Sequence, residues 1–250
     1  MNEFWTSEKL ESYKQASDYS SFHKRLAVLA EPYLEEKWTM ADLGCGPGLL
    51  SLQFAPMVAK ITAIDNDELA ISDLQARLDD VFLTDKTTAD RIQPVFGDVR
   101  ELDDEKWDVV LSSFLGVDEQ LLDDILPRAN KLALIYTRGR KESQEFSYLP
   151  DSKESAKLDV GGIEAYLDSK QYAYKKSVLE MQFGQPFKTI EDIHAYMAAQ
   201  YTGDVPDEEA LKRIAAAEES IVKSNRFDYS YYLPKSISVA LFIVVMKDDN

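Results

Sequence analysis

The sequence predicts an α/β protein: a doubly wound sheet of seven strands preceded by a helical cap. From Met40 onward, short β-branched or apolar runs alternate with helical patterns, as expected when parallel strands are joined by helices. Residues 1–37 read as helical, with apolar and aromatic side chains spaced among charges. The last apolar run, 236–247, has the composition of a strand buried on both faces. Together these patterns predict one layered core.

The individual elements follow from the same patterns. The predicted strands are short apolar runs at residues 39–44, 60–65, 92–97, 108–114, 131–137, 174–183 and 236–247. Helical spacing predicts helices over residues 48–57, 67–80, 118–129, 163–169, 189–200 and 207–223. Thr189 is expected to cap its helix with Asp192 three positions on, and Gly184-Gln185-Pro186 to end the sixth strand.

The charge of the chain disfavours nucleic acid as a partner. A formal net charge of -17 opposes binding to phosphates, which depends on Lys and Arg. The basic run at residues 137–141 is short, and the acidic stretch at 101–124 outweighs it. The single cysteine, Cys45, excludes an intrachain disulfide and, with only two histidines, makes a metal site unexpected. No signal peptide is recognisable, and the run 239–246 is too short to span a bilayer, so a cytoplasmic protein is expected.

The most informative stretch is the predicted turn between the first strand and the first helix after it. It reads Asp42-Leu43-Gly44-Cys45-Gly46-Pro47-Gly48, with glycine at three alternate positions. Glycine adopts positive φ in a tight turn and lets a ligand approach the backbone closely. The loop therefore predicts a binding site for a nucleoside-bearing ligand.

Glycine spacing separates the cofactor families that use such a loop. The dinucleotide fingerprint G-x-G-x-x-G would place its third glycine at Leu49 or Ser51, so both registers fail. A G-x-x-x-x-G-K-[ST] phosphate loop is also missing from the sequence. These spacings argue against an NAD-dependent oxidoreductase and a P-loop nucleotidase.

An acidic residue followed by G-x-G-x-G resembles the first motif of the class I S-adenosylmethionine-dependent methyltransferases, matched here by Asp42, Gly44, Gly46 and Gly48. The resemblance implies S-adenosylmethionine as cofactor and S-adenosylhomocysteine as product. It also implies a mostly parallel seven-stranded sheet with an antiparallel last strand. In the family the loop passes under the methionine and ribose, so Cys45 is expected at the cofactor as well.

Two further strand ends extend the resemblance. Asp65 ends the second predicted strand, where a carboxylate can accept both ribose hydroxyls, and Asn66 is expected near the adenine edge. By resemblance, Asp98 accepts from the adenine amine and the Val99 amide donates to a ring nitrogen. The alternative is that such aspartates only cap the next helix, as Asp67 could.

Candidates on the acceptor side are fewer. The end of the fourth strand resembles the family's pocket beside the sulfonium, which makes Ser112, Ser113 and Phe114 candidates. Tyr19 and His23 in the cap could face the acceptor if the cap closes over the site. The alternatives are that His23 is a partly exposed helix residue and that the tyrosines simply pack helices onto the sheet.

The expected activity is methyl transfer to a small, neutral or cationic molecule by a single domain. Residues 1–37 are its cap, 38–138 the cofactor-binding half and 139–250 the substrate-side half. No Asn-Pro-Pro-Tyr run follows the fourth strand, which with the charge favours a small-molecule acceptor. The stretch 182–187 also resembles methyltransferases of the ubiquinone-biosynthesis type, more loosely.

Several points stay open at this stage. No catalytic residue is assigned, because a general base is needed only for a hydroxyl or carbon-acid acceptor. The chain could be a monomer or a homodimer. A protein acceptor, or a regulatory S-adenosylmethionine-binding protein without catalysis, remains an alternative.

Overall fold

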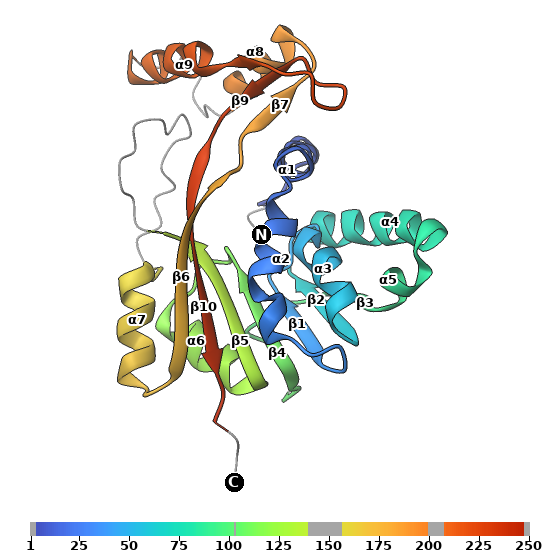
Figure 1. Ribbon diagram of the computed structural model, residues 1–250, viewed down its shortest axis with the longest axis vertical. Coiled ribbons are helices and arrows are strands. Elements are labelled where there is room, and N and C mark those ends of the chain that lie inside the picture. The colour runs from blue at the N-terminus through green and yellow to red at the C-terminus, as the bar shows by residue number, and fades with distance from the viewer. Residues whose placement is uncertain (1–3, 103, 140–156, 200–207, 248–250) are drawn as a thin grey trace.

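Seven strands form the main sheet in the order β3-β2-β1-β4-β5-β10-β6 (Figure 1). The structure, a computed structural model, describes residues 4–102, 104–139, 157–199 and 208–247. The strands of this sheet are β1 Thr39–Leu43, β2 Lys60–Asp65, β3 Ile92–Phe96, β4 Trp107–Ser113, β5 Ala129–Arg138, β6 Ala173–Gln182 and β10 Ser236–Val245.

The strand directions confirm the predicted fold class. β1 to β5 pair in parallel, and β10 runs antiparallel to both β5 and β6. The order reverses between β1 and β4, and in doubly wound sheets ligands bind outside the carboxyl ends of the strands at such a point. The loops after β1, β2, β3 and β4 therefore share one edge of the sheet.

Helices cover both faces of this sheet. The α-helices of the described residues are α1 Ser7–Ser20, α2 Phe22–Ala30, α3 Leu49–Phe54, α4 Glu68–Thr84, α5 Lys86–Asp90, α6 Glu119–Ile125, α7 Val160–Ser169, α8 Ile190–Ala199 and α9 Glu208–Ser220. Helices α2, α3 and α4 pack on one face of the main sheet and α6 and α7 on the other, whereas α8 and α9 lie away from it (Figure 1). Side chains alternate along each strand, so in β1 Met40 packs toward α2, α3 and α4, while Ala41 and Leu43 pack toward α6 and α7. Figure 1 shows these two helical layers on opposite sides of the sheet. None of the helices in the described residues has the length and apolarity to cross a membrane.

The predicted elements recur with small shifts at their ends. The helical cap is two helices, α1 and α2, which meet at Ser21 in a left-handed conformation with φ 55°. Thr189 caps α8 as expected: the Asp192 amide donates to its Oγ1, and its own amide donates to Asp192 Oδ2. The predicted ends of the last two helices at residues 200 and 207 lie outside the described residues.

A second, three-stranded sheet was not predicted. Its strands are β7 Gln185–Phe187, β9 Tyr231–Leu233 and β8 Val222–Lys223, in the order β7-β9-β8. Gly184-Gln185-Pro186 ends β6 as expected, but the chain then enters β7. With α8 and α9, this small sheet encloses its own apolar cluster, formed by Phe187, Ile193, Met197, Ala217 and Leu233. Below, the small sheet means the three strands β7, β9 and β8.

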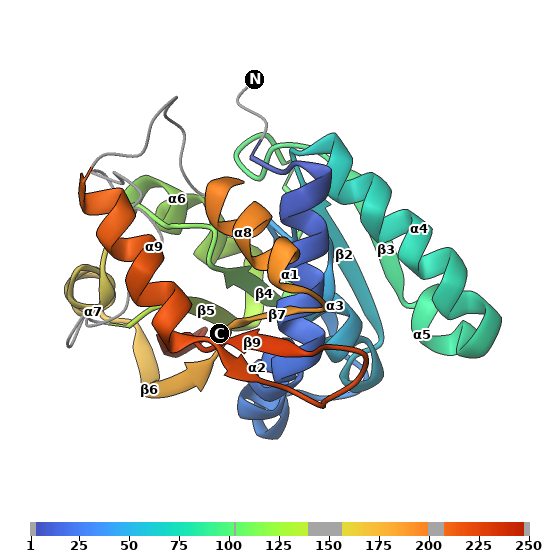
Figure 2. The same ribbon diagram turned by 90° about the horizontal axis from the view of Figure 1, so that it is seen from above.

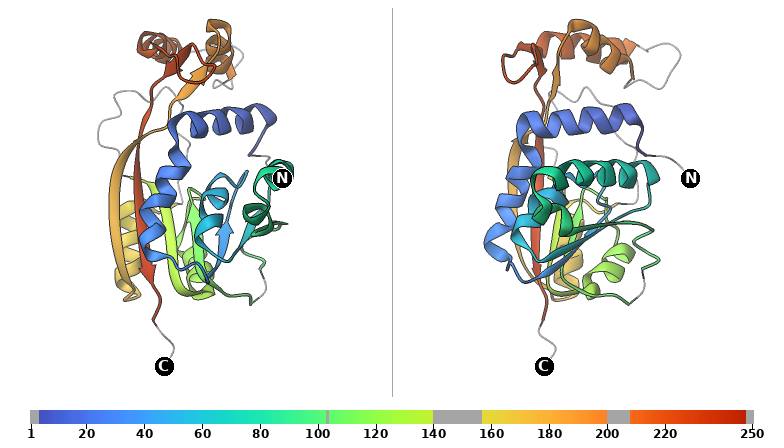
Figure 3. Two further views of the ribbon diagram at one scale, coloured as in Figure 1. Left: turned by 45° about the vertical axis from the view of Figure 1, so that its right-hand side comes forward. Right: turned by 90° about the vertical axis from the view of Figure 1, so that its right-hand side faces the viewer.

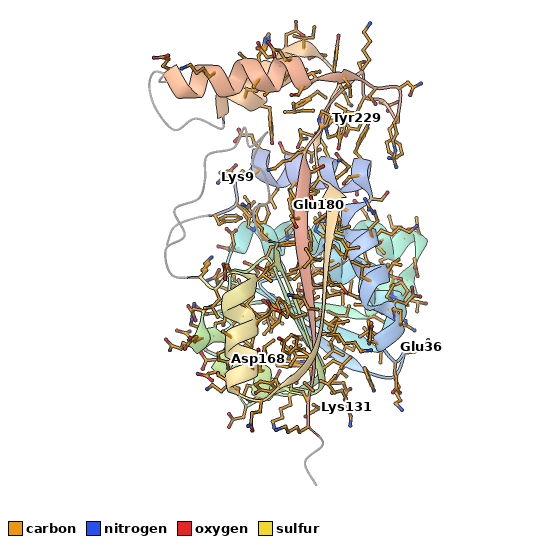
Figure 4. The ribbon with its side chains drawn as sticks, turned by 60° about the vertical axis from the view of Figure 1, so that its left-hand side comes forward. Lys9, Glu36, Lys131, Asp168, Glu180 and Tyr229 are labelled. Carbon is orange, nitrogen blue, oxygen red and sulfur yellow. The ribbon has the colours of Figure 1, made fainter. Side chains whose placement is uncertain are left out.

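Helix α1 lies between the main sheet and the small sheet. Figure 3 shows it spanning that position, and Figure 2 shows it alongside α4. Lys14 Nζ of α1 lies 2.6 Å from Asp73 Oδ1 of α4. In Figure 4, Tyr229 marks the small sheet and Lys131 the opposite end of the main sheet. Helix α1 and the small sheet therefore lie over the edge of the main sheet at which strands β1 to β5 end (Figure 3).

Tyr19 joins α1 to the small sheet. Its ring stacks on Tyr232 with centroids 4.6 Å apart, and the Arg226 guanidinium lies 5.3 Å from the ring centroid. Its hydroxyl lies 2.8 Å from Ser224 Oγ, within hydrogen-bonding distance. These contacts occupy the ring and hydroxyl of Tyr19, so its expected acceptor-side role stays a prediction.

Replacing Tyr19 by Ala is expected to loosen the small sheet without unfolding the main one. The change removes a stacked aromatic pair and a hydrogen bond, which together stabilise by about 1–3 kcal/mol. Hydrogen exchange at β9 amides should accelerate, while exchange in β1 and β4 should stay as in the wild type. Tyr19→Phe is the matched control: it keeps the stacked ring and should lose only the stabilisation from the hydroxyl's hydrogen bond. Equal acceleration in both sheets would contradict local docking.

Candidate functional site

The glycine loop between β1 and α3 is built around positive φ. Gly44, Gly46 and Gly48 have φ of 71°, 53° and 66°, a region in which side chains are strained. Each glycine also lies under a side chain that would meet an added Cβ. The three covering side chains are, in the same order, Leu115, Trp5 and Leu74. The sequence predicted the backbone requirement, and the structure adds these three packing contacts.

Asp42 is a buried acid with one unsatisfied oxygen. It is 1% exposed at the end of β1, and Ser51 Oγ of α3 donates to its Oδ2. Its Oδ1 has no hydrogen-bond partner among the described residues. Burial, and to a smaller extent the negative charge of Asp65, raises the pKa of Asp42 to about 7. A donor or a cation entering here would meet a free acceptor.

Asp65 ties the glycine loop to the end of β2. The Gly46 amide donates to its Oδ2 at 2.7 Å, and the Asp67 amide donates to its Oδ1 at 2.9 Å. Burial raises the pKa of Asp65, although these two amides favour the charged form. Each carboxylate oxygen has a second acceptor position, so Asp65 can still receive ligand hydroxyls.

Asp67 has the capping role that the sequence left open. Its Oδ1 accepts from the amides of Leu69 and Ala70 at the start of α4. Its Oδ2 accepts from the Trp5 amide at 3.1 Å. Asp67 therefore holds the beginning of the cap near the glycine loop and caps α4, whereas Asp65 anchors the glycine loop itself.

The end of β3 leaves open space. A Cβ built at Gly97 would meet nothing within 4 Å, and the Gly97 amide donates to the Asp65 carbonyl oxygen. Asp98 accepts from the Arg100 amide at 2.9 Å, Asn66 is exposed and the Val99 side chain is buried. The structure thus brings Asn66 and Asp98 to neighbouring strand ends beside this space.

The end of β4 completes the edge. Ser112 is buried, paired in register with Leu43 of β1 and Ile135 of β5, and Ser113 is half-buried. Phe114 then adopts a left-handed conformation with φ 54°, while its amide donates to the Tyr136 carbonyl oxygen. Such strained residues gather at functional sites.

His23 is buried, which corrects the expectation of a partly exposed helix residue. It is 3% exposed; Tyr13 Oη lies 2.8 Å from its Nε2, and Ser17 Oγ lies 2.6 Å from its Nδ1. Burial, with a smaller effect from the Arg77 charge, lowers the pKa of His23 to about 3. His23 is therefore a neutral imidazole that joins α1 to α2. His194 instead lies at the surface, 3.6 Å from Glu218.

An aromatic cluster connects the cap to the sheet edge. The Phe183 ring lies 4.5 Å from Phe22 and 5.4 Å from Tyr13, between ring centroids. Phe22 also contacts Phe114, and Tyr13 contacts Trp5 above Gly46. Phe183 belongs to the 182–187 stretch that the sequence singled out.

Sequence reasoning missed Trp5 and Ser51. The signal for Ser51 was a small polar residue between Leu50 and Leu52 in an otherwise mostly apolar run, one helical turn after the glycine loop. For Trp5 no local signal existed, since its contact crosses more than 40 residues of chain. Cys45 lies in the loop, and burial raises the pKa of its thiol. Within the described ranges, no three His, Cys, Asp or Glu side chains are grouped to hold a metal ion.

Comparisons with known proteins identify part of the chain. Residues 40–132 match a family model described as a methyltransferase domain. A ribosomal protein L11 methyltransferase of Clostridium botulinum (strain Eklund 17B / Type B) is 31% identical over 118 residues, which is 46% of this chain and 36% of that protein. One from Acetivibrio thermocellus is 28% identical over 94 residues, 37% of this chain and 28% of that protein. The chain thus spans about a third of the length of these curated relatives.

Solved structures with the same fold cover nearly the whole chain. Magnesium protoporphyrin IX methyltransferase from Synechocystis PCC 6803 with bound SAH has a TM-score of 0.56 at 12% identity, covering 95% of this chain and 94% of that one. A SAM-dependent methyltransferase from Geobacter sulfurreducens has a TM-score of 0.53 at 14% identity, covering 94% and 98%. At such identities the likeness concerns the fold, and it confirms the predicted fold family.

Gly48→Ala is expected to destabilise the fold, and Gly97→Ala to leave it unchanged. An alanine at Gly48 is strained at φ 66° and overlaps Leu74, at a cost of at least about 2 kcal/mol. At Gly97 the added methyl meets open space, so the change should stay within about 0.5 kcal/mol. Urea unfolding of both variants measures this. Equal losses would contradict the loop geometry.

Asp42→Asn is expected to change how stability depends on pH. The folded pKa of Asp42, about 7, lies above its unfolded value, so the wild type loses stability as pH rises from about 4 to 7. Asparagine cannot ionise. The free energy of unfolding of the variant, relative to that of the wild type, should therefore rise by on the order of 1–4 kcal/mol between pH 4.5 and 7.5. Urea unfolding at both pH values checks this, and a constant difference would contradict it.

Proposed function

We propose that this chain, whose residues 40–132 form a methyltransferase domain within a class I methyltransferase fold, transfers a methyl group from S-adenosylmethionine to a small-molecule acceptor. The observation that carries the proposal is the meeting of Asp42 and Asp65 at the glycine loop, on the switch-point edge of the sheet. The curated relatives match only part of this chain, so they support the presence of a methyltransferase domain more than the identity of the acceptor.

The residues at this edge fit the chemistry of the cofactor. S-adenosylmethionine carries an ammonium and a sulfonium, and the unpaired Oδ1 of Asp42 offers a buried acceptor to a cationic donor. The free acceptor positions of Asp65 suit a ribose diol. The open space at Gly97, flanked by Asn66 and Asp98, leaves room for a base.

Trp5 and Leu115 belong to the same fit. They cover Gly46 and Gly44, where the loop is expected to approach the methionine part of the cofactor. We infer that these two side chains shift aside when the cofactor enters and then pack against it. The hydrogen bond from the Trp5 amide to Asp67 holds the backbone of Trp5 in place while its side chain moves.

The chain's part in the reaction is alignment and exclusion of water. The bound cofactor supplies a methyl group on an excellent leaving group, so holding the acceptor in line is the main requirement. The aromatic cluster of the cap and the Phe114 turn provide an apolar wall beside the end of β4. The low pKa of His23 makes it a poor base, so its bonds to Tyr13 and Ser17 serve to position the cap.

A protein acceptor is the second candidate. It is favoured by the printed names of the curated relatives, which are ribosomal protein L11 methyltransferases. The covered edge, with α1 and the small sheet above it, favours a small molecule instead (Figure 3). Incubation with methyl-labelled cofactor, separately with a metabolite fraction and with a protein fraction of a cell extract, separates the two. Cofactor binding without label transfer to either fraction would indicate a regulatory protein.

Asp65→Asn is expected to weaken S-adenosylhomocysteine binding by at least about tenfold, because one charge-assisted acceptor of the ribose is lost. Isothermal titration calorimetry of the purified variant measures this. Asp85→Asn is the matched control, since Asp85 caps α5 away from the loop, and its affinity should equal that of the wild type. Undiminished affinity in a folded Asp65→Asn protein would falsify the ribose assignment.

A further inference from the structure

Two basic residues lie on the acceptor side of the sheet edge. Arg138 ends β5 and is paired in register with Val239 of β10. Val239 is fully buried in the core on the α2 side, and residues opposite each other in an antiparallel pair share a face. Arg138 therefore belongs to the face that carries the cap, at the carboxyl end of β5.

Lys235 lies on that same face, on the chain just before β10. The Phe183 amide donates to the Lys235 carbonyl oxygen, which continues the pairing of Ser236 with Gln182. Phe183 packs against the core on the α2 side and against the rings of Tyr13 and Phe22. Lys235 is thus the direct cross-strand neighbour of the aromatic cluster.

The two cations are close enough to affect each other. Lys235 and Val239 are four residues apart, or ~13 Å along a strand, a gap that long lysine and arginine side chains can narrow. Burial and the positive charge of Arg138 lower the pKa of Lys235 to about 8. A half-buried lysine beside an exposed arginine, with each positive charge disfavouring the other, is a ready site for an anion.

Neither cation has a counter-charge among the described residues. In the part of the chain that the structure describes, no hydrogen bond or salt bridge involves the side chain of Arg138 or Lys235, although the chain carries 45 acidic residues against 28 basic ones. By contrast, Lys170 and Lys176 on the far side of the sheet pair with carboxylates at 2.6 Å.

We propose that Arg138 and Lys235 bind an oxyanion group of the methyl acceptor, a carboxylate or a phosphate, while its apolar body lies against Phe183 and Phe114. This inference rests on the proposed function, because it places the acceptor beside the end of β4. It also changes the expected acceptor from a neutral or cationic small molecule to an acidic one. Arginine offers a planar fork and lysine a point charge, and both suit carboxylate and phosphate.

The test uses the full chain saturated with S-adenosylhomocysteine and three probes that share one ring: benzoate, phenyl phosphate and benzamide. Binding is measured by calorimetry or ligand-detected NMR, without any methyl transfer. At pH 7, benzoate or phenyl phosphate should bind at least about tenfold more tightly than the neutral benzamide. The stronger of the two anions identifies the kind of oxyanion.

Variants assign the preference to the two cations. Lys235→Gln and Arg138→Gln should each reduce the anion preference by about tenfold. Lys60→Gln, which removes an exposed lysine at the opposite edge of the sheet, should keep it. Equal binding of benzamide, no anion binding, or an unchanged preference in Lys235→Gln would each overturn the inference. Failure of S-adenosylhomocysteine to bind at the outset would instead overturn the proposed function.

A pH series separates the charge of Lys235 from a purely structural effect. Facing this position are Arg138 and Tyr136 on β5, Tyr13 on α1 and His23 on α2. Burial lowers the pKa of His23 to about 3 and raises the pKa values of both tyrosines. Benzoate binding to the wild type should therefore weaken from pH 7 to 9.5 as Lys235 loses its proton. Lys235→Arg should retain binding across this range, and a parallel loss in that variant would contradict the assignment.

Discussion

The site depends on the carboxylate of Asp65, which accepts from the amides of Gly46 and Asp67. Three glycines at positive φ have no side chains to hold their loop, so the loop needs an anchor from outside. Asp65 supplies it from the neighbouring strand. The cost is a second buried acid near Asp42: burial raises the pKa of both carboxyl groups, and the negative charge of Asp65 raises the pKa of Asp42 further. A cationic ligand would relieve that cost.

Helix α1 links this loop to the rest of the molecule. At one end Trp5 covers Gly46 and donates to Asp67. In its middle Tyr13 reaches His23, and at its other end Tyr19 stacks on Tyr232 of the small sheet. The segment formed by Trp5 and α1 therefore contacts the glycine loop, α2 and the small sheet in turn.

Charge is divided across the edge of the sheet. The cofactor side, at β1 and β2, holds buried acids, while the other side, at β5 and β10, holds Arg138 and Lys235, whose side chains pair with no carboxylate of the described residues. In a chain of net charge -17 this basic position is a local exception, which composition alone hides. The division suits a cationic cofactor on one side and an acidic acceptor on the other, with a neutral aromatic wall between them.

By itself, the sequence determined the sheet, its helices and the glycine loop, because hydrophobic period, glycine spacing and strand-end acids are local signals. It also brought Asp42, Asp65 and Asp98 to one edge, since parallel strands end together. Only the tertiary structure decided the small sheet, the burial of His23, the cover over the glycines and the pairing of Lys235 with Phe183. Each of these is a contact between distant segments, or a strand too short to show a period, and such features leave no local pattern.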